Sequence, residues 1–348
     1  MADAALQRFR LRALLSLPRP ILRGLAGGGV VYIGGRTLDP PLQFLASQAR
    51  RLAPLSSLTP QEARVGSAQA LVPMAAKLEP GVRVEFLQVP GGDDPLAARA
   101  YRSEDQDPDA PLMVFAHFGG GVIGDLDTAE AFCALLAKIA RCPVLSVDYR
   151  LAPENRFPAG LEDVLSAYRW ARDNAAHFGA LQGRVAIGGD SMGGNFAAVT
   201  AQEMKRVCEP QPILQLLIYP LVDVASETAS MTTYAQAYPL SRGTLEWFMG
   251  HYMRPGDSPA DPRLSPSKAG DLSGLAPAVI ATAGFDPLLD QGEAYAKALR
   301  AAGVSVDYRC YDNLAHAFTA FTGVVPAAEA ACREIARLVR DRFAGASP

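Results

Sequence analysis

The stretch Gly189-Asp190-Ser191-Met192-Gly193-Gly194-Asn195 decides the fold, because of what stands on either side of it. Residues 184–188 form a short apolar run that favours a strand, and residues 192–208 have the spacing of a helix. A G-x-S-x-G motif on a sharp strand-to-helix turn exposes the serine hydroxyl, and its glycines let neighbouring elements approach. The sequence therefore predicts that Ser191 is a nucleophile, rather than an incidental serine in a glycine-rich turn.

Strands and helices alternate outward from this turn. Two strand-like runs at 82–89 and 96–101 flank a Gly-Gly-Asp-Asp turn and predict a hairpin. Beyond it, the pattern predicts strands at 111–116, 142–149, 184–188, 213–219, 278–283 and 306–311, and helices at 128–140, 159–178, 192–208, 291–302 and 327–343. Such alternation indicates an α/β fold whose mainly parallel sheet is covered by helices on both faces.

Two segments stand outside the alternation. Residues 1–80 are expected to be mostly helical, with one helix starting at Thr59-Pro60-Gln61-Glu62, where Thr59 would be the N-cap. Residues 220–276, rich in aromatic, polar and proline residues, are interpreted as an insertion leaning over the carboxyl edge of the sheet.

The N-terminus alternates arginines with apolar residues, and Pro18 and Pro20 interrupt it where a signal peptide would be continuous. A packed helix, a peripheral contact with a lipid surface and a targeting segment all remain open. No apolar run reaches the ~18 residues of a membrane span, so no stable insertion is expected.

The composition excludes several classes of protein. Of the 348 residues, 49% are hydrophobic, which is far too many for a disordered chain. Lys plus Arg number 33 against 36 Asp plus Glu, and this balance argues against a nucleic-acid binder. The five cysteines form no C-x-x-C pair or zinc-type cluster, so we expect no metal and free thiols in a reducing cytoplasm.

The partners of Ser191 follow from chain order. The G-x-S-x-G turn is typical of α/β-hydrolases, in which an acid and then a histidine follow the serine along the chain. Among the four histidines, His316 alone follows a late strand, and Asp286 stands at the tip of the strand expected at 278–283. Asp286 is preferred over Asp290, one helical turn later, and over Asp312, which we assign to turn chemistry.

A glycine-rich loop at residues 115–121 follows another strand and could point backbone N–H groups into a cavity. The competing interpretation, phosphate binding, lacks the G-x-x-x-x-G-K-[ST] pattern. Stabilisation of an oxyanion is therefore the preferred interpretation of this loop.

Together these motifs resemble the hormone-sensitive-lipase-like branch of the α/β-hydrolases, the bacterial esterase family IV. The resemblance rests on the serine motif, on Val147-Asp148-Tyr149-Arg150-Leu151-Ala152-Pro153-Glu154, on Val122-Ile123-Gly124-Asp125, on Gly284-Phe285-Asp286-Pro287-Leu288 and on His316-Ala317-Phe318. It implies an eight-stranded sheet in a catalytic domain at residues 81–348, and a helical cap built from residues 1–80 and an insertion at about 221–275. It also implies a serine carboxylesterase that acts on short- to medium-chain acyl esters without a cofactor.

The resemblance assigns the oxyanion donors to the backbone N–H groups of Gly119, Gly120 and Met192. Three departures from the family pattern stand out. Met192 replaces the usual alanine, and Leu289 and Gln291 replace an arginine and a glutamate. Phe118 and Gly121 exchange the usual glycine and aromatic residue, which makes them candidates for the wall of the substrate pocket.

Other functions remain open at this stage. An amide-cleaving relative, such as an aryl-acylamidase or a peptidase, would use the same residues. A non-catalytic receptor on this fold would lack the histidine, whereas here all three triad positions are filled. Family members are often dimers, so a homodimer also remains open.

Overall fold

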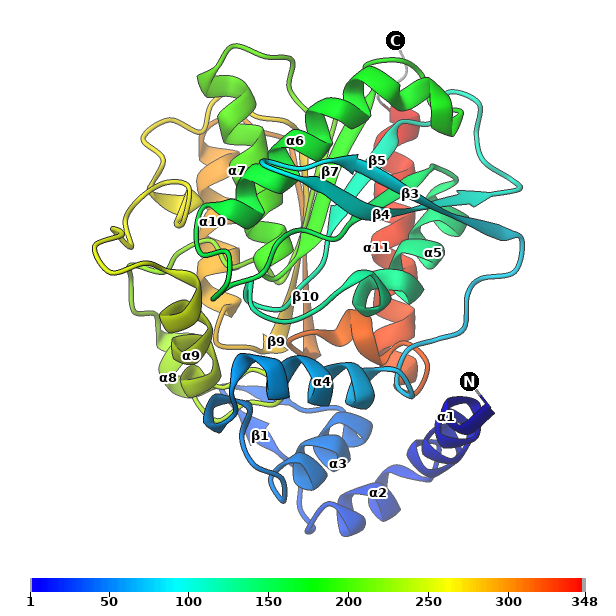
Figure 1. Ribbon diagram of the computed structural model, residues 1–348. Coiled ribbons are helices and arrows are strands. Elements are labelled where there is room, and N and C mark those ends of the chain that lie inside the picture. Colours follow the sequence, from blue (N-terminus) through cyan, green and yellow to red (C-terminus); the bar gives the residue numbers. More distant parts are fainter. Residues whose placement is uncertain (1, 346–348) are drawn as a thin grey trace.

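The computed structural model describes residues 2–345, with side chains from residue 5 onward. One sheet of eight strands runs through the molecule in the order β10-β9-β8-β7-β5-β6-β4-β3 (Figure 1). Strands β3 and β4 form the predicted antiparallel hairpin, β4 pairs antiparallel with β6, and all other pairs are parallel. The strands are β3 Val82–Pro90, β4 Pro95–Ser103, β5 Leu112–Ala116, β6 Val144–Val147, β7 Val185–Asp190, β8 Gln215–Ile218, β9 Ala278–Phe285 and β10 Val306–Ala315.

Helices cover both faces of this sheet, as the alternating pattern predicts. Side chains of one strand point alternately to the two faces, and in β5 Leu112 and Val114 join one hydrophobic core while Met113 and Phe115 join the other. Helices α6 (Ala159–Asn174), α7 (Met192–Arg206) and α10 (Leu289–Ala301) pack on the first face, and α5 (Leu126–Ala140) and α11 (Pro326–Gly345) on the second. The predicted α/β-hydrolase fold class is confirmed.

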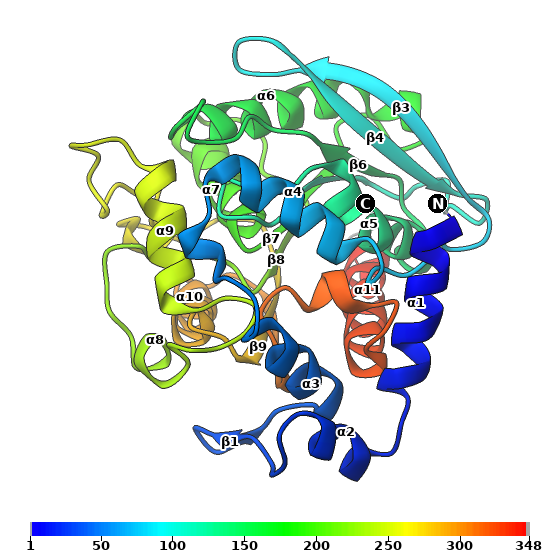
Figure 2. The ribbon, with the colours of Figure 1, turned by 60° about the horizontal axis from the view of Figure 1, so that its bottom comes forward.

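The N-terminal residues form a chain of short elements along the side where β9 and β10 end (Figures 1 and 2). The capping box predicted at Thr59 is present: the Glu62 N–H donates to Thr59 Oγ1, and the Thr59 N–H donates to Glu62 Oε2. A small hairpin between α2 and α3 was not predicted. The elements are α1 Ala2–Leu15, α2 Arg19–Leu25, β1 Tyr32–Ile33, β2 Arg36–Thr37, α3 Pro40–Ala49, the 3-10 turn Leu55–Ser57 and α4 Pro60–Leu71.

The insertion between β8 and β9 contains α8 (Ala229–Thr233), α9 (Arg242–Tyr252) and the 3-10 turn Pro266–Lys268. Figure 1 shows α8 and α9 at the same end of the molecule as α4. The remaining 3-10 turns are Ala175–Phe178, after α6, and Phe318–Phe321, after β10. Among residues 2–345, no helix is both long enough and apolar enough to cross a bilayer.

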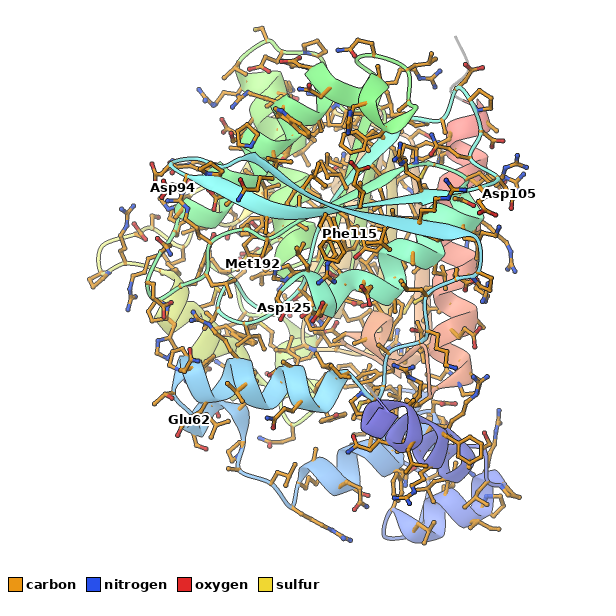
Figure 3. All side chains as sticks on the ribbon, turned by 45° about the vertical axis from the view of Figure 1, so that its right-hand side comes forward. Glu62, Asp94, Asp105, Phe115, Asp125 and Met192 are labelled. Atoms are coloured by element: carbon orange, nitrogen blue, oxygen red, sulfur yellow. The ribbon has the colours of Figure 1, made fainter. Side chains whose placement is uncertain are left out.

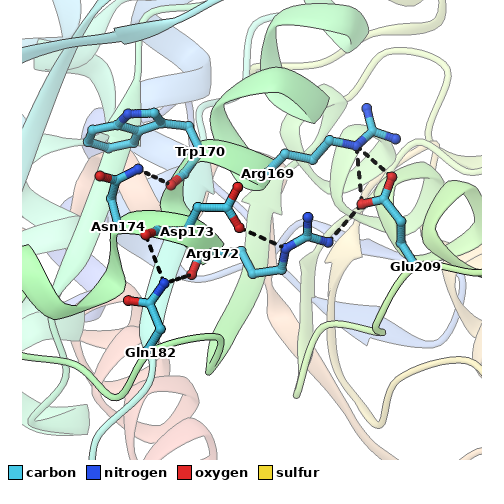
Figure 4. A network of polar contacts seen from close by, with 7 residues as sticks. All are labelled: Arg169, Trp170, Arg172, Asp173, Asn174, Gln182 and Glu209. Atoms are coloured by element: carbon cyan, nitrogen blue, oxygen red, sulfur yellow. Dashed lines mark hydrogen bonds and ion pairs between the residues drawn. The ribbon is translucent and has the colours of Figure 1, made fainter.

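A polar network joins α6 to the segment that follows α7 (Figure 4). Glu209, just after α7, accepts hydrogen bonds from Arg172 (2.7 Å) and Arg169 (3.0 Å) of α6. The Gln182 side chain donates to the last carbonyl groups of α6. These contacts hold the C-terminal part of α6 against the segment that follows α7.

Candidate active site

Ser191 is the single residue that separates a strand from a helix. Strand β7 ends at Asp190 and helix α7 begins at Met192, and Ser191 between them has φ 55° and ψ −112°. Such a conformation is strained for a residue other than glycine and marks functional turns. A Cβ on Gly193 would lie 1.9 Å from the carbonyl oxygen of Ala116, so only glycine lets the turn pack against β5.

The structure brings the serine, histidine and aspartate named from the sequence into contact. Ser191 Oγ lies 2.9 Å from Nε2 of His316, and Nδ1 of His316 lies 2.7 Å from Oδ2 of Asp286. His316 follows the end of β10, and Asp286 follows the end of β9. The histidine and the aspartate are 5% and 1% exposed, so water is largely excluded from the hydrogen bond between them. In this arrangement the histidine can accept the serine proton, and the buried carboxylate can stabilise the imidazolium that forms.

The two rejected aspartates lie elsewhere. Asp290 accepts a hydrogen bond from the backbone N–H of Ser230, at the start of α8. The assignment of Asp312 to turn chemistry was wrong: this residue lies within β10, and its carboxylate pairs with Arg36 at 2.8 Å. The partner is 276 residues away in sequence, so no local pattern could indicate it.

The glycine loop follows β5 and takes up backbone conformations that favour glycine. Gly119, Gly120 and Gly121 have φ of 132°, 63° and 73°. Within residues 2–345, the backbone N–H groups of Gly119, Gly120 and Met192 donate no hydrogen bond to the protein. Backbone N–H groups that remain free to donate are what an oxyanion site requires.

Helix α9 packs directly on this loop. A Cβ on Gly120 would lie 2.3 Å from Cγ of Phe248, and a Cβ on Gly121 would lie 2.7 Å from Cδ2 of Tyr252. The Tyr252 ring therefore occupies the space beside Gly121, where the family pattern has an aromatic side chain. Figure 3 labels Met192 at the start of α7, with Phe115 of β5 and Asp125 of the segment after the glycine loop in the same view.

His117 supports the loop from within. Its Nδ1 donates to the carbonyl oxygen of Phe118 at 2.7 Å, and its own carbonyl oxygen accepts from the Tyr149 hydroxyl at 2.8 Å. The His117 and Tyr149 rings stack at 4.3 Å. Complete burial lowers the pKa of His117 from its usual 6.5 to about 4. The imidazole is therefore neutral at neutral pH. A neutral imidazole carries one N–H, and here the Nδ1–H donates to the Phe118 carbonyl oxygen.

A cavity of about 560 Å³ lies beneath α4, and Phe118 forms part of its wall. The Phe118 ring is almost buried and packs on Ala317, next to His316, and on Leu71 of α4. Ser191 does not line the cavity. Phe118 thus stands between the histidine loop and the cavity. The lining includes Arg64, Ala68, Leu71, Phe118, Ile123, Asp125, Asp148 and Glu154.

Asp190 is a buried carboxylate whose part in the site was missed in the sequence, although it stands inside the quoted motif. Its Oδ2 accepts from the hydroxyl groups of Tyr219 (2.9 Å) and Thr319 (2.8 Å). The Tyr219 ring lies against His316, with ring centroids 4.7 Å apart. Burial raises the pKa of Asp190 to about 6. This group links the serine turn, strand β8 and the segment after the histidine.

Arg64 and Asn195 tie the surrounding segments to the site. Arg64 of α4 donates to the carbonyl oxygens of Val122 (2.9 Å) and Ala152 (2.7 Å) and pairs with Glu154 (2.6 Å). The Asn195 amide, on the first turn of α7, donates to the carbonyl oxygens of Leu221 and Leu264, both at 2.8 Å. Asn195 could have been singled out as part of the serine motif, but Arg64 carries no local signal.

Among the described residues, no group of three or more His, Cys, Asp or Glu side chains is placed to hold a metal ion. All five cysteines are unpaired.

Comparisons with known proteins agree with this geometry. A family model described as the α/β-hydrolase fold matches residues 113–320. The carboxylic ester hydrolase LipN of Mycobacterium tuberculosis is 45% identical over 318 residues, covering 88% of this chain and 84% of that one. The ethyl acetate hydrolase of Pseudomonas putida is 35% identical, with coverage of 81% and 90%.

Among solved structures, the ester hydrolase EH1AB1 from the metagenome of Lake Arreo, in complex with a bipyridine phosphonate derivative, is 36% identical. It superposes with a TM-score of 0.85, covering 88% of this chain and 99% of that one. The chain therefore belongs to the α/β-hydrolase family, in the hormone-sensitive-lipase-like branch that its motifs predict.

Proposed function

We propose that this protein is a serine carboxylesterase that hydrolyses short- to medium-chain acyl esters through an acyl-enzyme. The observation that carries the proposal is the chain of contacts at the carboxyl edge of the sheet. Ser191 Oγ lies 2.9 Å from His316 Nε2, and His316 Nδ1 lies 2.7 Å from Asp286. Relatives at 35% to 45% identity are named as ester hydrolases, which supports the same activity here.

The proposal gives each step of the reaction to a named residue. Ser191 Oγ attacks the ester carbonyl carbon while Nε2 of His316 takes its proton, and Asp286 holds the histidine tautomer. The N–H groups of Gly119, Gly120 and Met192 bind the oxyanion as the tetrahedral intermediate forms. His316 then gives the proton to the departing alcohol, and a water molecule activated by the same histidine releases the acid and regenerates the serine.

The test is the variant Ser191→Ala. Loss of the nucleophile should lower kcat for a p-nitrophenyl ester by about 10⁶-fold, while the thermal melting curve remains close to that of the wild type. A fluorophosphonate probe should label the wild-type protein at Ser191 and leave the variant unlabelled. A purified, folded variant that kept a tenth of wild-type turnover would show that the nucleophile is another residue.

The same assay separates ester from amide cleavage. An acyl anilide with the same acyl group, offered beside the p-nitrophenyl ester, reports the amide-cleaving alternative directly. We expect the ester to be turned over much faster. Comparable kcat/KM values for both substrates would favour the amidase, and probe labelling without turnover of either would favour a receptor.

Two further parts of the proposal concern the protein in the cell. We expect it to act in the cytoplasm, because its five cysteines are all unpaired and three of them are buried. Whether the protein forms a homodimer, as members of this family often do, stays open, and sedimentation of the purified protein measures its oligomeric state directly. The cap assignment, residues 1–80 with about 221–275, remains a proposal that rests on how α4 and α9 pack over the glycine loop.

A further inference from the structure

Helix α1 exposes apolar side chains on the face opposite the one that packs on the protein. Leu15 is buried, and Leu11 packs against the same core. On the other side, Leu6 and Phe9 are 46% and 71% exposed. At 100° per residue, Leu6, Phe9 and Ala13 share one stripe of the helix. An apolar stripe facing solvent is not needed to hold α1 in place.

The next helix also exposes apolar side chains, and both helices carry positive charge. Ile21 and Leu25, one helical turn apart on α2, are each about half exposed. Arg10 and Arg12 flank the α1 stripe on its two sides, and Arg19 begins α2. Within the described chain, Arg10 and Arg12 form no ion pair. We call Leu6, Phe9, Ile21 and Leu25 with these three arginines the N-terminal surface.

The charge of this segment differs from that of the rest of the protein. Residues 1–51 contain eight arginines, no lysine and two aspartates, a net charge of +6. Because the whole chain carries −3, the remaining residues carry −9. A negatively charged partner would therefore be attracted to residues 1–51 and repelled by the rest of the molecule.

We propose that the N-terminal surface binds peripherally to an anionic lipid bilayer. Exposed leucine and phenylalanine side chains beside arginines have the chemistry that interfacial helices use, with the apolar groups entering the boundary of the acyl chains. The arginines add attraction to acidic headgroups, on the order of five-fold in partitioning for each charge. The inference does not depend on the proposed esterase activity.

The position of the surface adds a consequence for orientation. Figures 1 and 2 show α1 and α2 on the outside of the molecule, at the end where β9 and β10 finish and α4 lies. Asp286 and His316 follow the ends of these two strands. A bilayer bound to the N-terminal surface would therefore lie on the same end of the molecule as the candidate site.

The experiment uses the full chain carrying Ser191→Ala, so that hydrolysis cannot alter the vesicles. Co-sedimentation with phosphatidylcholine vesicles is compared with vesicles that also contain phosphatidylglycerol, at low and at high salt. We expect binding only to the anionic vesicles, and we expect salt to weaken it. Equal binding to both compositions, or no binding to either, would overturn the proposal.

Matched variants identify the surface responsible. Phe9→Ser is paired with Phe86→Ser, because Phe86 on β3 is equally exposed at 72% and is not part of the N-terminal surface. Arg10→Glu/Arg12→Glu is paired with Arg83→Glu/Lys297→Glu, which changes the charge by the same amount on β3 and α10. We expect at least a ten-fold loss of partitioning in the N-terminal variants and none in the controls, with unchanged melting curves throughout.

Two results would contradict the assignment. Equal losses in the control variants would mean that overall charge or hydrophobicity drives binding. A concentration-dependent dimer in the absence of vesicles, abolished by Phe9→Ser, would mean that the stripe is covered by a second copy of the chain instead.

Discussion

At the scale of single residues, His117 shows how burial of one side chain sets a pH limit for the whole fold. The folded protein resists protonation of this ring, because complete burial removes the charged form from solvent, and its pKa falls to about 4. The unfolded chain takes up the proton near its usual 6.5. The stability that His117 contributes is therefore complete above about pH 6.5 and is lost as the pH falls toward 4.

This loss can be measured. Between about pH 7 and pH 4, the free energy of unfolding should fall by roughly 3 kcal/mol through this group, in addition to any other titrating residue. His117→Asn keeps a side-chain donor for the Phe118 carbonyl group but removes the titration. Urea unfolding at both pH values should show that the free energy of unfolding falls less in the variant than in the wild type. An equal fall in the two proteins would contradict the assignment of this pH dependence to His117.

Phe118 is the residue at which substrate size should be decided. Its ring separates the histidine loop from the 560 Å³ cavity under α4. We predict that Phe118→Ala connects this space to the site and shifts kcat/KM from acetate toward octanoate esters. Loss of a buried ring should also cost about 3–5 kcal/mol of stability.

Phe118→Leu, which keeps most of the volume, is the control for that variant. Both proteins are compared with the wild type on esters from acetate to octanoate. A chain-length profile in Phe118→Ala that matches the wild type would remove Phe118 from the pocket wall.

The residues that sequence could identify are those with a local signature. Ser191 follows a strand and precedes a helix, and Asp286 and His316 follow later strands, so chain order was enough to name them. The structure brings these same three side chains together. Asp190 was overlooked because its role comes from Tyr219 and Thr319, whose approach depends on how three strands pair.

At the scale of elements, α4 is hydrogen-bonded to the backbone around the glycine loop through Arg64. Arg64 reaches the Val122 carbonyl group just after the loop, as well as the Ala152 carbonyl group, and the Ala152 N–H donates to Gly121 at 2.8 Å. The position of α4 is thereby coupled to the backbone that would bind the oxyanion. Loss of this contact should affect the transition state more than the binding of substrate.

We predict that Arg64→Gln lowers kcat by up to about 10²-fold with little change in KM, since a small displacement of oxyanion donors costs that much. Arg64→Lys should recover part of the loss. Glu154→Gln removes the ion pair but leaves both carbonyl contacts, so it should stay near wild-type activity. A rise in KM with unchanged kcat in Arg64→Gln would instead place this residue in substrate binding.

Most elements lie within a few residues of their predicted positions, because buried strands and amphipathic helices leave periodic patterns in the sequence. The β1–β2 hairpin was missed because each of its strands has only two residues, too few for any period. The contact of α9 with the glycine loop could not be predicted from the sequence either. Phe248 and Gly120 are far apart in the sequence, and each looks ordinary in its own segment.

At the scale of the whole molecule, the candidate site is assembled at one edge of a continuous sheet. With no cluster of ligating side chains among the described residues, we predict that EDTA leaves ester hydrolysis unchanged. The assay is run before and after dialysis against the chelator, together with metal analysis of the protein. Stoichiometric zinc combined with loss of activity on chelation would contradict the serine mechanism.

The contacts of Asn195 have a consequence for how this molecule could be rebuilt. One amide holds both ends of the segment between Leu221 and Leu264, so the chain leaves the scaffold and returns to it at nearly the same point. A segment with adjoining ends behaves as a detachable module, and its counterpart from a relative could be grafted between the same two anchors without moving the strand ends that carry the triad. A graft would have to keep an aromatic contact with the glycine loop, because Phe248 and Tyr252 of this segment fill the space beside Gly120 and Gly121.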